Sequence, residues 1–167
     1  TVWLAIHVTI IMVSYAVLAL GVLFAHMQIG IGIFAPKRRD LIARMADLQY
    51  WYTHVGVIFL IAGILTGSVW ASFSWGRYWG WDPKEVWSLV AMLGYMAILH
   101  ARLAGWLGAF GSAVCSTMAF WLIVMTYVGV NFVLGTGLHS YAFGKGAVVR
   151  WLMIIGFGIG SVALCGW

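Results

Sequence analysis

Residues 75–87 read Trp-Gly-Arg-Tyr-Trp-Gly-Trp-Asp-Pro-Lys-Glu-Val-Trp and lie between two long apolar segments. Four of these thirteen residues are tryptophan, and Gly76 and Gly80 keep the backbone between the rings open. Tryptophan is common where a membrane segment meets water, but such an aromatic belt usually spreads its rings over many helix ends. The concentration of rings in one short stretch favours a second interpretation, a platform on which a large planar ligand stacks.

The composition places the chain in a membrane. Hydrophobic residues make up 64% of the 167 residues and charged residues only 8%, too few charges to cover a soluble domain. Because a span takes about 20 residues, five apolar segments predict an all-α, polytopic transmembrane bundle of about five spans. They lie at 3–26, 48–72, 84–103, 108–135 and 148–167. We treat residues 1–167 as a single transmembrane domain. Since the chain starts abruptly, with Thr1 leading straight into a span, we expect it to be a fragment.

The distribution of charged residues indicates how the chain is oriented in the membrane. The net charge of +5 comes from short loops beside the membrane rather than from a basic face, which excludes nucleic acid as a partner. The densest basic patch, residues 36–40 with Arg44, predicts that the first loop is cytoplasmic. Alternation then places outside both the Trp-rich loop at residues 75–87, which holds four tryptophans, and the loop at 136–147. Of the nine Lys and Arg residues, five fall inside, including Arg102, and four fall outside: Arg77, Lys84, Lys145 and Arg150.

The third apolar segment has a marked helix start. Asp82 is suited to the N-cap, Pro83 to the first helical position, and Glu85 to the third, where its side chain can close a capping box. This accounts for most of the presence of these three residues, but it leaves the aromatic rings unexplained. Arg77 and Lys84 lie among those rings and could pair with carboxylates on a ligand. A planar macrocycle that carries propionates, haem, fits both halves of this description. The expected haem-binding residues are Trp75, Gly76, Arg77, Tyr78, Trp79, Trp81, Asp82 and Trp87.

Two of the five histidines are expected on the same outer side as this stretch. His7 lies in the first turns of the first segment, and His139 lies in the loop that follows the fourth. Either histidine alone would more often be a hydrogen-bonded structural residue. Two neutral imidazoles on opposite faces are, however, a standard axial pair for haem iron. Together with the aromatic stretch, His7 and His139 therefore predict the two axial ligands.

The remaining histidines and the cysteines carry weaker signals. His100 lies 17 residues beyond Pro83, or about 25 Å along a helix, near the cytoplasmic end. It is either a second site or a histidine that favours the helix C-terminus, and both interpretations stay open. His26, at the end of the first segment, and His54 are interpreted as structural. Cys115 and Cys165 lie inside apolar segments without a CxxC spacing, so we interpret them as buried small hydrophobes.

The stretch at 75–87 resembles the WWD domain of haem-handling membrane proteins. Its ending, Trp-Asp-Pro-Lys-Glu-x-Trp, is similar to that of the system II cytochrome c assembly proteins of the CcsA/ResC type. Three further stretches resemble the same family in the same order. They are residues 5–8 (Ala-Ile-His-Val), residues 99–102 (Leu-His-Ala-Arg), and residues 127–141, which include Gly-Val-Asn and Gly-Leu-His-Ser-Tyr.

The resemblance implies a path for haem b across a bacterial inner membrane or a thylakoid membrane. Haem would enter a transmembrane site that uses His100, with a second ligand from a helix outside this chain. It would then reach the WWD site on the periplasmic or lumenal side, where His7 and His139 would ligate the iron. There the thiols of a CxxCH motif in apocytochrome c would attack the haem vinyl groups. The chain would act as part of a holocytochrome c synthase, with a CcsB/ResB-type partner. Because members of that family usually have more spans, the resemblance also implies that N-terminal helices of the full protein are missing from this chain.

The competing class is a non-catalytic subunit of a respiratory complex that binds haem or quinone permanently. Such a subunit usually places both haem ligands within the bilayer, whereas the two histidines expected here flank an outer loop. A transporter would need polar residues along a midplane pathway, and Asn131 and His100 are too few and too far apart for one. The sequence pattern of the family described above assigns no role to His54.

Overall fold

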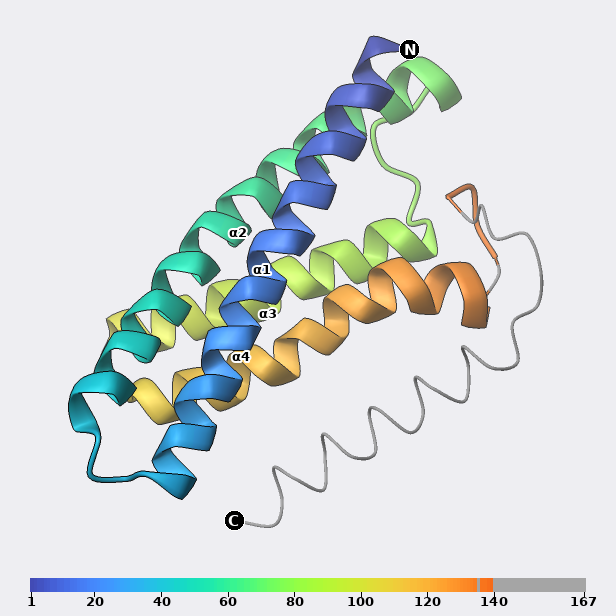
Figure 1. The fold of residues 1–167 in the computed structure, drawn as a ribbon. Coiled ribbons are helices and arrows are strands. Elements are labelled where there is room, and N and C mark those ends of the chain that lie inside the picture. The colour runs from blue at the N-terminus through green and yellow to red at the C-terminus, as the bar shows by residue number, and fades with distance from the viewer. Residues whose placement is uncertain (135, 140–167) are drawn as a thin grey trace.

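The computed structural model describes residues 1–134 and 136–139, and all of the regular secondary structure in these ranges is helical (Figure 1). Its elements are α1 (Val2–Phe34), α2 (Arg39–Trp75), α3 (Pro83–Leu103), α4 (Ala109–Val124) and the π-helical continuation of α4, η1 (Met125–Leu134). Four helices are long and apolar enough to cross a membrane, with α4 and η1 counted as one. The all-α class is thereby confirmed, and the fifth expected span, 148–167, lies outside the described residues.

Helices α1 and α2 form a closely packed antiparallel pair because α2 presents glycines to α1. A methyl group added at Gly56 would lie 2.6 Å from the Leu18 side chain, and one added at Gly63 would lie 2.6 Å from Ile11. Small residues at such positions let two helix backbones approach, which supplies most of the attraction between helices in lipid. This seam continues to Gly67, and it therefore fixes where the first turns of α1 lie.

Helices α3 and α4 form a second antiparallel pair that crosses the first (Figure 1). The buried core between the pairs contains Leu18, Leu60, Tyr95, Leu99 and Ile123. Large apolar side chains also cover the outside, as a bundle solvated by lipid tails requires. They include Leu20, Leu23, Ile58, Leu65, Leu93 and Met118.

The first two helices are longer than the apolar pattern predicted. Helix α1 continues to Phe34 and α2 already begins at Arg39, so the connection between them is only residues 35–38. With 33 and 37 residues, the two helices measure about 50 and 55 Å, against about 30 Å for the hydrocarbon core. The apolar segments mark only the part that lipid can surround. Consequently His26 lies within α1 rather than at its end, and Arg44 lies in a helix rather than in a loop.

The aromatic stretch at residues 75–87 is also divided between helix and loop differently from the sequence prediction. Because α2 ends at Trp75 and α3 begins at Pro83, only residues 76–82 connect the two helices. Trp75 and Trp87 are therefore helical, and two of the four tryptophans, Trp79 and Trp81, lie in the connection. The expectation of four tryptophans in one loop was wrong, because α2 continues to Trp75, directly before Gly76, and Trp87 lies in the second turn of α3.

The start of α3 was predicted correctly. Asp82 is the N-cap and accepts a hydrogen bond from the backbone N–H of Lys84 at 3.3 Å, while Pro83 occupies the first turn. Glu85 completes the capping box, because its Oε2 accepts from the backbone N–H of Asp82 at 3.1 Å. The start of α1, the end of α2, the start of α3 and the end of η1 all lie at one end of the bundle (Figure 1).

Candidate functional site

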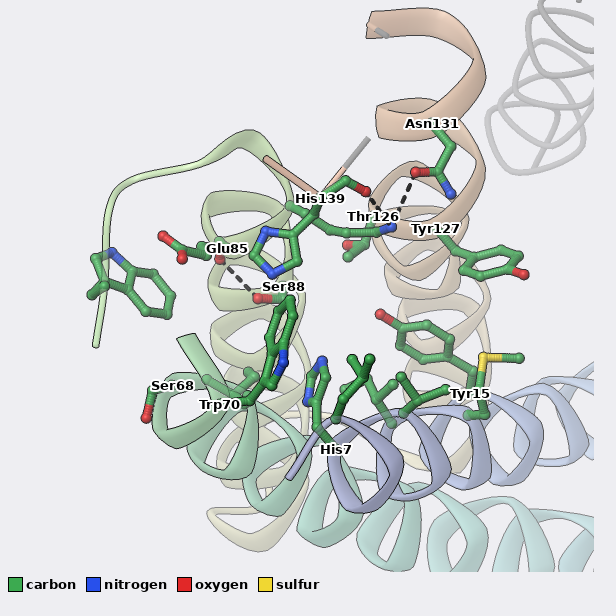
Figure 2. Close-up of a pocket in the computed structure, with 18 of the residues that line it drawn as sticks. His7, Tyr15, Ser68, Trp70, Glu85, Ser88, Thr126, Tyr127, Asn131 and His139 are labelled. Carbon is green, nitrogen blue, oxygen red and sulfur yellow. Dashed lines mark hydrogen bonds between the residues drawn. The ribbon is translucent and has the colours of Figure 1, made fainter. Parts of the chain in front are cut away.

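A cavity of about 550 Å³ opens at this end of the bundle, between α1, α2, α3 and η1 (Figure 2). Its volume lies within the range of sites for organic ligands. One wall is apolar and comes from α1, with Leu4, Val8 and Ile11. The opposite wall carries polar groups from α3 and η1, among them Lys84 and Asn131. The cavity thus combines a hydrophobic face with a few polar groups, as ligand sites do.

His7 lines the cavity and is held there by α2. Its Nδ1 lies 2.8 Å from the carbonyl oxygen of Gly63. Because a carbonyl can only accept a hydrogen bond, Nδ1 carries the proton and Nε2 keeps its lone pair. Gly67 makes room for the ring, since a methyl group added there would lie 2.6 Å from Cε1 of His7. The glycine seam between the two helices therefore fixes the imidazole.

His139 lines the same cavity from the loop after η1. Its Nδ1 lies 2.9 Å from Oδ2 of Asp82, and the backbone N–H of Leu138 donates to Oδ1 of the same carboxylate at 2.6 Å. The turn depends on Gly137, whose φ is +97° and where an added Cβ would collide with the Asp82 carboxylate. Asp82 was predicted to be a cap and a haem contact, and in the structure it also anchors the loop that carries His139.

Both imidazoles contact the indole of Trp70, as Figure 2 shows. The ring centroids of His7 and Trp70 are 6.2 Å apart with nearly parallel planes, and those of His139 and Trp70 are 5.7 Å apart, edge to face. Trp75 packs against His139 with a centroid distance of 4.7 Å. Sequence reasoning missed Trp70, which is only 7% exposed. A signal existed, because Gly63, Gly67 and Trp70 follow a spacing of four and three and so share one helix face.

Of the other residues predicted to bind haem, some line the cavity and the rest do not. Tyr78 and Trp79 line the cavity. Trp81 is 71% exposed, with its ring edge against Trp79 at a centroid distance of 6.0 Å. Neither Trp87 in α3 nor Gly76, the left-handed C-cap of α2, is among the described residues that line the cavity. Arg77 is exposed and packs against Gly80.

Lys84 and Glu85 hold the site together from the start of α3. The ammonium of Lys84 donates to Oδ1 of Asn131 at 3.0 Å and to the carbonyl oxygen of His139 at 3.2 Å. Glu85 accepts from the backbone N–H of Gly80 at 2.8 Å as well as from its own cap residue. The two side chains therefore connect α3 to η1, to the His139 loop and to the segment that carries Trp79.

His100 lies at the far end of the bundle. It is exposed in the last turn of α3, where its Nδ1 lies 2.7 Å from the carbonyl oxygen of Met96, and it lines a shallow hollow with Trp106. Arg102 lies nearly on the opposite side of α3 and places its guanidinium over the ring of Tyr50, 4.4 Å from the centroid. Nothing in the described residues places a second imidazole beside His100 in that hollow.

His26 and His54 each bond a carbonyl of their own helix through Nδ1, at 2.8 and 2.9 Å. Both fit the structural interpretation given to them. Cys115 is partly buried in α4 and forms no disulfide with another described residue. Cys165, Lys145 and Arg150 lie outside the described residues.

The donor set of the cavity suits a haem iron. The porphyrin supplies four nitrogens, so the protein needs to add only two ligands. His7 and His139 each have Nδ1 hydrogen-bonded, which leaves Nε2 as the nitrogen that can ligate a metal, the usual arrangement of a histidine that binds metal. By contrast, residues 1–134 and 136–139 contain no group of three or more His, Cys, Asp or Glu that could hold a bare metal ion. The surrounding indole and phenol rings suit a flat apolar ligand.

Comparison with known proteins identifies the family of the chain. The family described as Cytochrome C assembly protein matches residues 1–139. The chain is 40% identical over 151 residues to the cytochrome c biogenesis protein CcsA of Chlamydomonas reinhardtii, which covers 84% of the chain and 41% of that protein. It is 37% identical over 169 residues to CcsA of Prochlorococcus marinus (strain MIT 9312), covering 84% and 54%. The chain thus spans about half the length of the curated relatives it matches.

Proposed function

Because the chain belongs to the cytochrome c assembly protein family, we propose that it holds haem in the cavity at the start of α3 and presents it for covalent attachment to apocytochrome c. The observation that carries the proposal is the pair of imidazoles that line this cavity. His7 comes from α1 and His139 from the loop after η1, and each has its Nδ1 bonded to another part of the chain. Each Nε2 is therefore available to bind iron.

The aromatic residues supply the contact with the porphyrin plane. Trp70 and Trp75 pack against the imidazoles, and Tyr78 and Trp79 line the cavity beside them. Aromatic rings bury a large area against a flat ligand and orient it at the same time. The haem propionates would pair with Lys84, which lines the cavity, and with Arg77, which is exposed and precedes the cavity residue Tyr78 in the chain.

The proposed attachment reaction does not need the cysteines of this chain. Each thiol of a CxxCH motif adds across one haem vinyl group, so that sulfur bonds one carbon and the hydrogen ends on the other. No electrons are exchanged with the protein in this addition, and the haem iron is in the reduced state. Replacing Cys115 and Cys165 together should leave maturation intact, because both thiols come from the apocytochrome.

The proposed orientation follows from the charges. The basic residues at 36–40 and Arg44 lie at the end of the bundle opposite to the cavity, which favours a cavity on the periplasmic or lumenal side. We place a second haem at His100 on the cytoplasmic end, with its other ligand supplied from outside the described residues. A CcsB/ResB-type partner would complete this path.

Copurification tests the function and separates it from its rival. The chain is expressed with a CcsB/ResB-type partner and an apocytochrome c, and the bound haem is analysed as pyridine haemochrome. The proposal predicts b-type haem on the protein together with c-type haem on the copurified cytochrome. A permanent haem subunit of a respiratory complex would yield b-type haem and no c-type product, and that result would contradict the proposal.

A further inference from the structure

Asp82 holds His139 through both of its carboxylate oxygens. Oδ2 accepts from Nδ1 of His139 at 2.9 Å, and Oδ1 accepts from the backbone N–H of Leu138 at 2.6 Å. The carboxylate is buried, with its residue 6% exposed, so water competes little for these bonds. The helix cap alone would need only the bond from the backbone N–H of Lys84.

His7 has a weaker partner. The carbonyl oxygen of Gly63 carries no net charge, and it also accepts from the hydroxyl of Thr66 at 3.1 Å. A hydrogen bond to a carboxylate is about twice as strong as one between neutral groups. The two imidazoles that line the cavity therefore differ in the group bonded to Nδ1, which is a neutral carbonyl for His7 and a carboxylate for His139.

We propose that Asp82 is a positioning residue that makes His139 the stronger electron donor of the two iron ligands. The inference rests on the proposed function, since it concerns haem bound between His7 and His139. A carboxylate bonded to Nδ1–H fixes the tautomer of the ring and raises the basicity of Nε2. The negative charge also stabilises ferric iron over ferrous iron, so Asp82 lowers the reduction potential of the bound haem.

The substitution Asp82→Asn removes the charge and keeps the helix cap. Asparagine caps a helix as well as aspartate does, and its side-chain oxygen can still accept from Nδ1 of His139 and the N–H of Lys84. The bond from the N–H of Leu138 is lost with the charge, because the amide nitrogen of asparagine cannot accept it. We expect about tenfold weaker ferric haem binding, which corresponds to a rise of about 59 mV in a one-electron potential if ferrous binding is unchanged.

Asp47→Asn is the matched control. It makes the same exchange of a carboxylate for an amide, but Asp47 is exposed in α2 and is not among the residues that line the cavity. The reduced-minus-oxidised titration and the ferric electron paramagnetic resonance spectrum are recorded on purified haem-loaded chains. We expect Asp82→Asn to raise the potential and shift the low-spin g values, whereas Asp47→Asn leaves the potential and the g values of the wild type.

The outcomes separate the inference from the function beneath it. If Asp82→Asn binds haem with the wild-type potential and g values, the role of Asp82 is wrong while the haem site stands. If the wild-type chain itself shows no low-spin haem, the proposed function is wrong. Should Asp82→Asn fail to accumulate in the membrane, Asp82→Ser keeps a helix cap without reaching His139, and the same shifts are expected of it.

Discussion

The two ends of the bundle hold their histidines in different ways. At the cavity, Nδ1 of His7 and Nδ1 of His139 bond residues 56 and 57 positions away in the sequence. Elsewhere, His26, His54 and His100 each bond the carbonyl four residues earlier in their own helix. A bond within one turn forms wherever the helix forms, and it needs no tertiary structure. A bond between distant elements exists only in the folded chain, and it fixes the ring before any ligand arrives.

The long-range bonds therefore distinguish His7 and His139, whose rings are fixed by the tertiary structure, from histidines that are held only by their own helix. Both kinds leave Nε2 for a ligand, so free nitrogen alone does not identify a site. In the cavity, each imidazole lies in the same site as a second imidazole, several aromatic side chains and the cation of Lys84. Substitutions at the two ends should therefore differ in their effects on haem binding.

The largest effect is expected from His7→Ala and His139→Ala. Each removes one of the two iron ligands, so haem bound to the purified chain should fall at least about tenfold. His26→Ala and His54→Ala are the matched controls, and they should retain wild-type haem because each removes only a bond within its own helix. Pyridine haemochrome analysis measures all four. Equal loss in the controls would remove the distinction between the two kinds of histidine.

A smaller effect is expected from Gly67→Ala. The added methyl group would lie 2.6 Å from the ring of His7, so either the imidazole or α1 must move. Overpacking of this kind costs about 1–3 kcal/mol, and we expect a lower thermal midpoint in detergent together with reduced haem content. In Gly32→Ala the new methyl group meets open space. If both variants keep wild-type stability and haem, the glycine seam does not position His7.

Gly137→Ala tests the other ligand. It combines a strained left-handed residue, at about 1–3 kcal/mol, with a collision against Asp82. The His139 loop should then leave the carboxylate, and haem content should drop a few-fold. Gly105→Ala introduces similar backbone strain at φ +76° but meets open space. Haem titration of the two purified variants should therefore show a loss for Gly137→Ala only, and matched losses would point to strain alone.

The smallest effect on the cavity is expected from His100→Ala. His100 lies at the far end of α3, and its Nδ1 is satisfied by Met96. The spectrum of haem at the cavity should be unchanged, while any second haem bound at the far end should be lost. Spectral comparison after partial haem loading measures this. A change in the spectrum of the cavity haem would show that the two ends are coupled.

Much of the fold could be predicted from hydropathy, but the helix ends could not. Four expected spans are present as helices because long apolar segments have one stable form in lipid. Phe34 and Arg39 were missed as boundaries because a helix continues into the polar headgroup region, where charge is no longer excluded. The start of α3 was predicted correctly because a capping box is a local interaction between Asp82 and Glu85.

The site was only partly predictable, because contacts between distant helices cannot be read from local sequence. His7 and His139 were expected on one side, and the structure brings both to one cavity, while their role as iron ligands stays a prediction. Trp70 was missed because it lies inside an apolar segment, where its contact with two imidazoles depends on how α1 packs. Trp87 was included because a sequence cluster was taken as a cluster in space, although a helix turns its residues in different directions.

The spin state of the bound haem tests most directly whether His7 and His139 bind one iron. Ferric electron paramagnetic resonance of the haem-loaded chain should show a low-spin, six-coordinate iron with two imidazole ligands. In His7→Ala and in His139→Ala, any remaining haem should become high-spin, and His26→Ala should keep the low-spin signal. A low-spin signal that survives either of the two cavity substitutions unchanged would contradict the assignment.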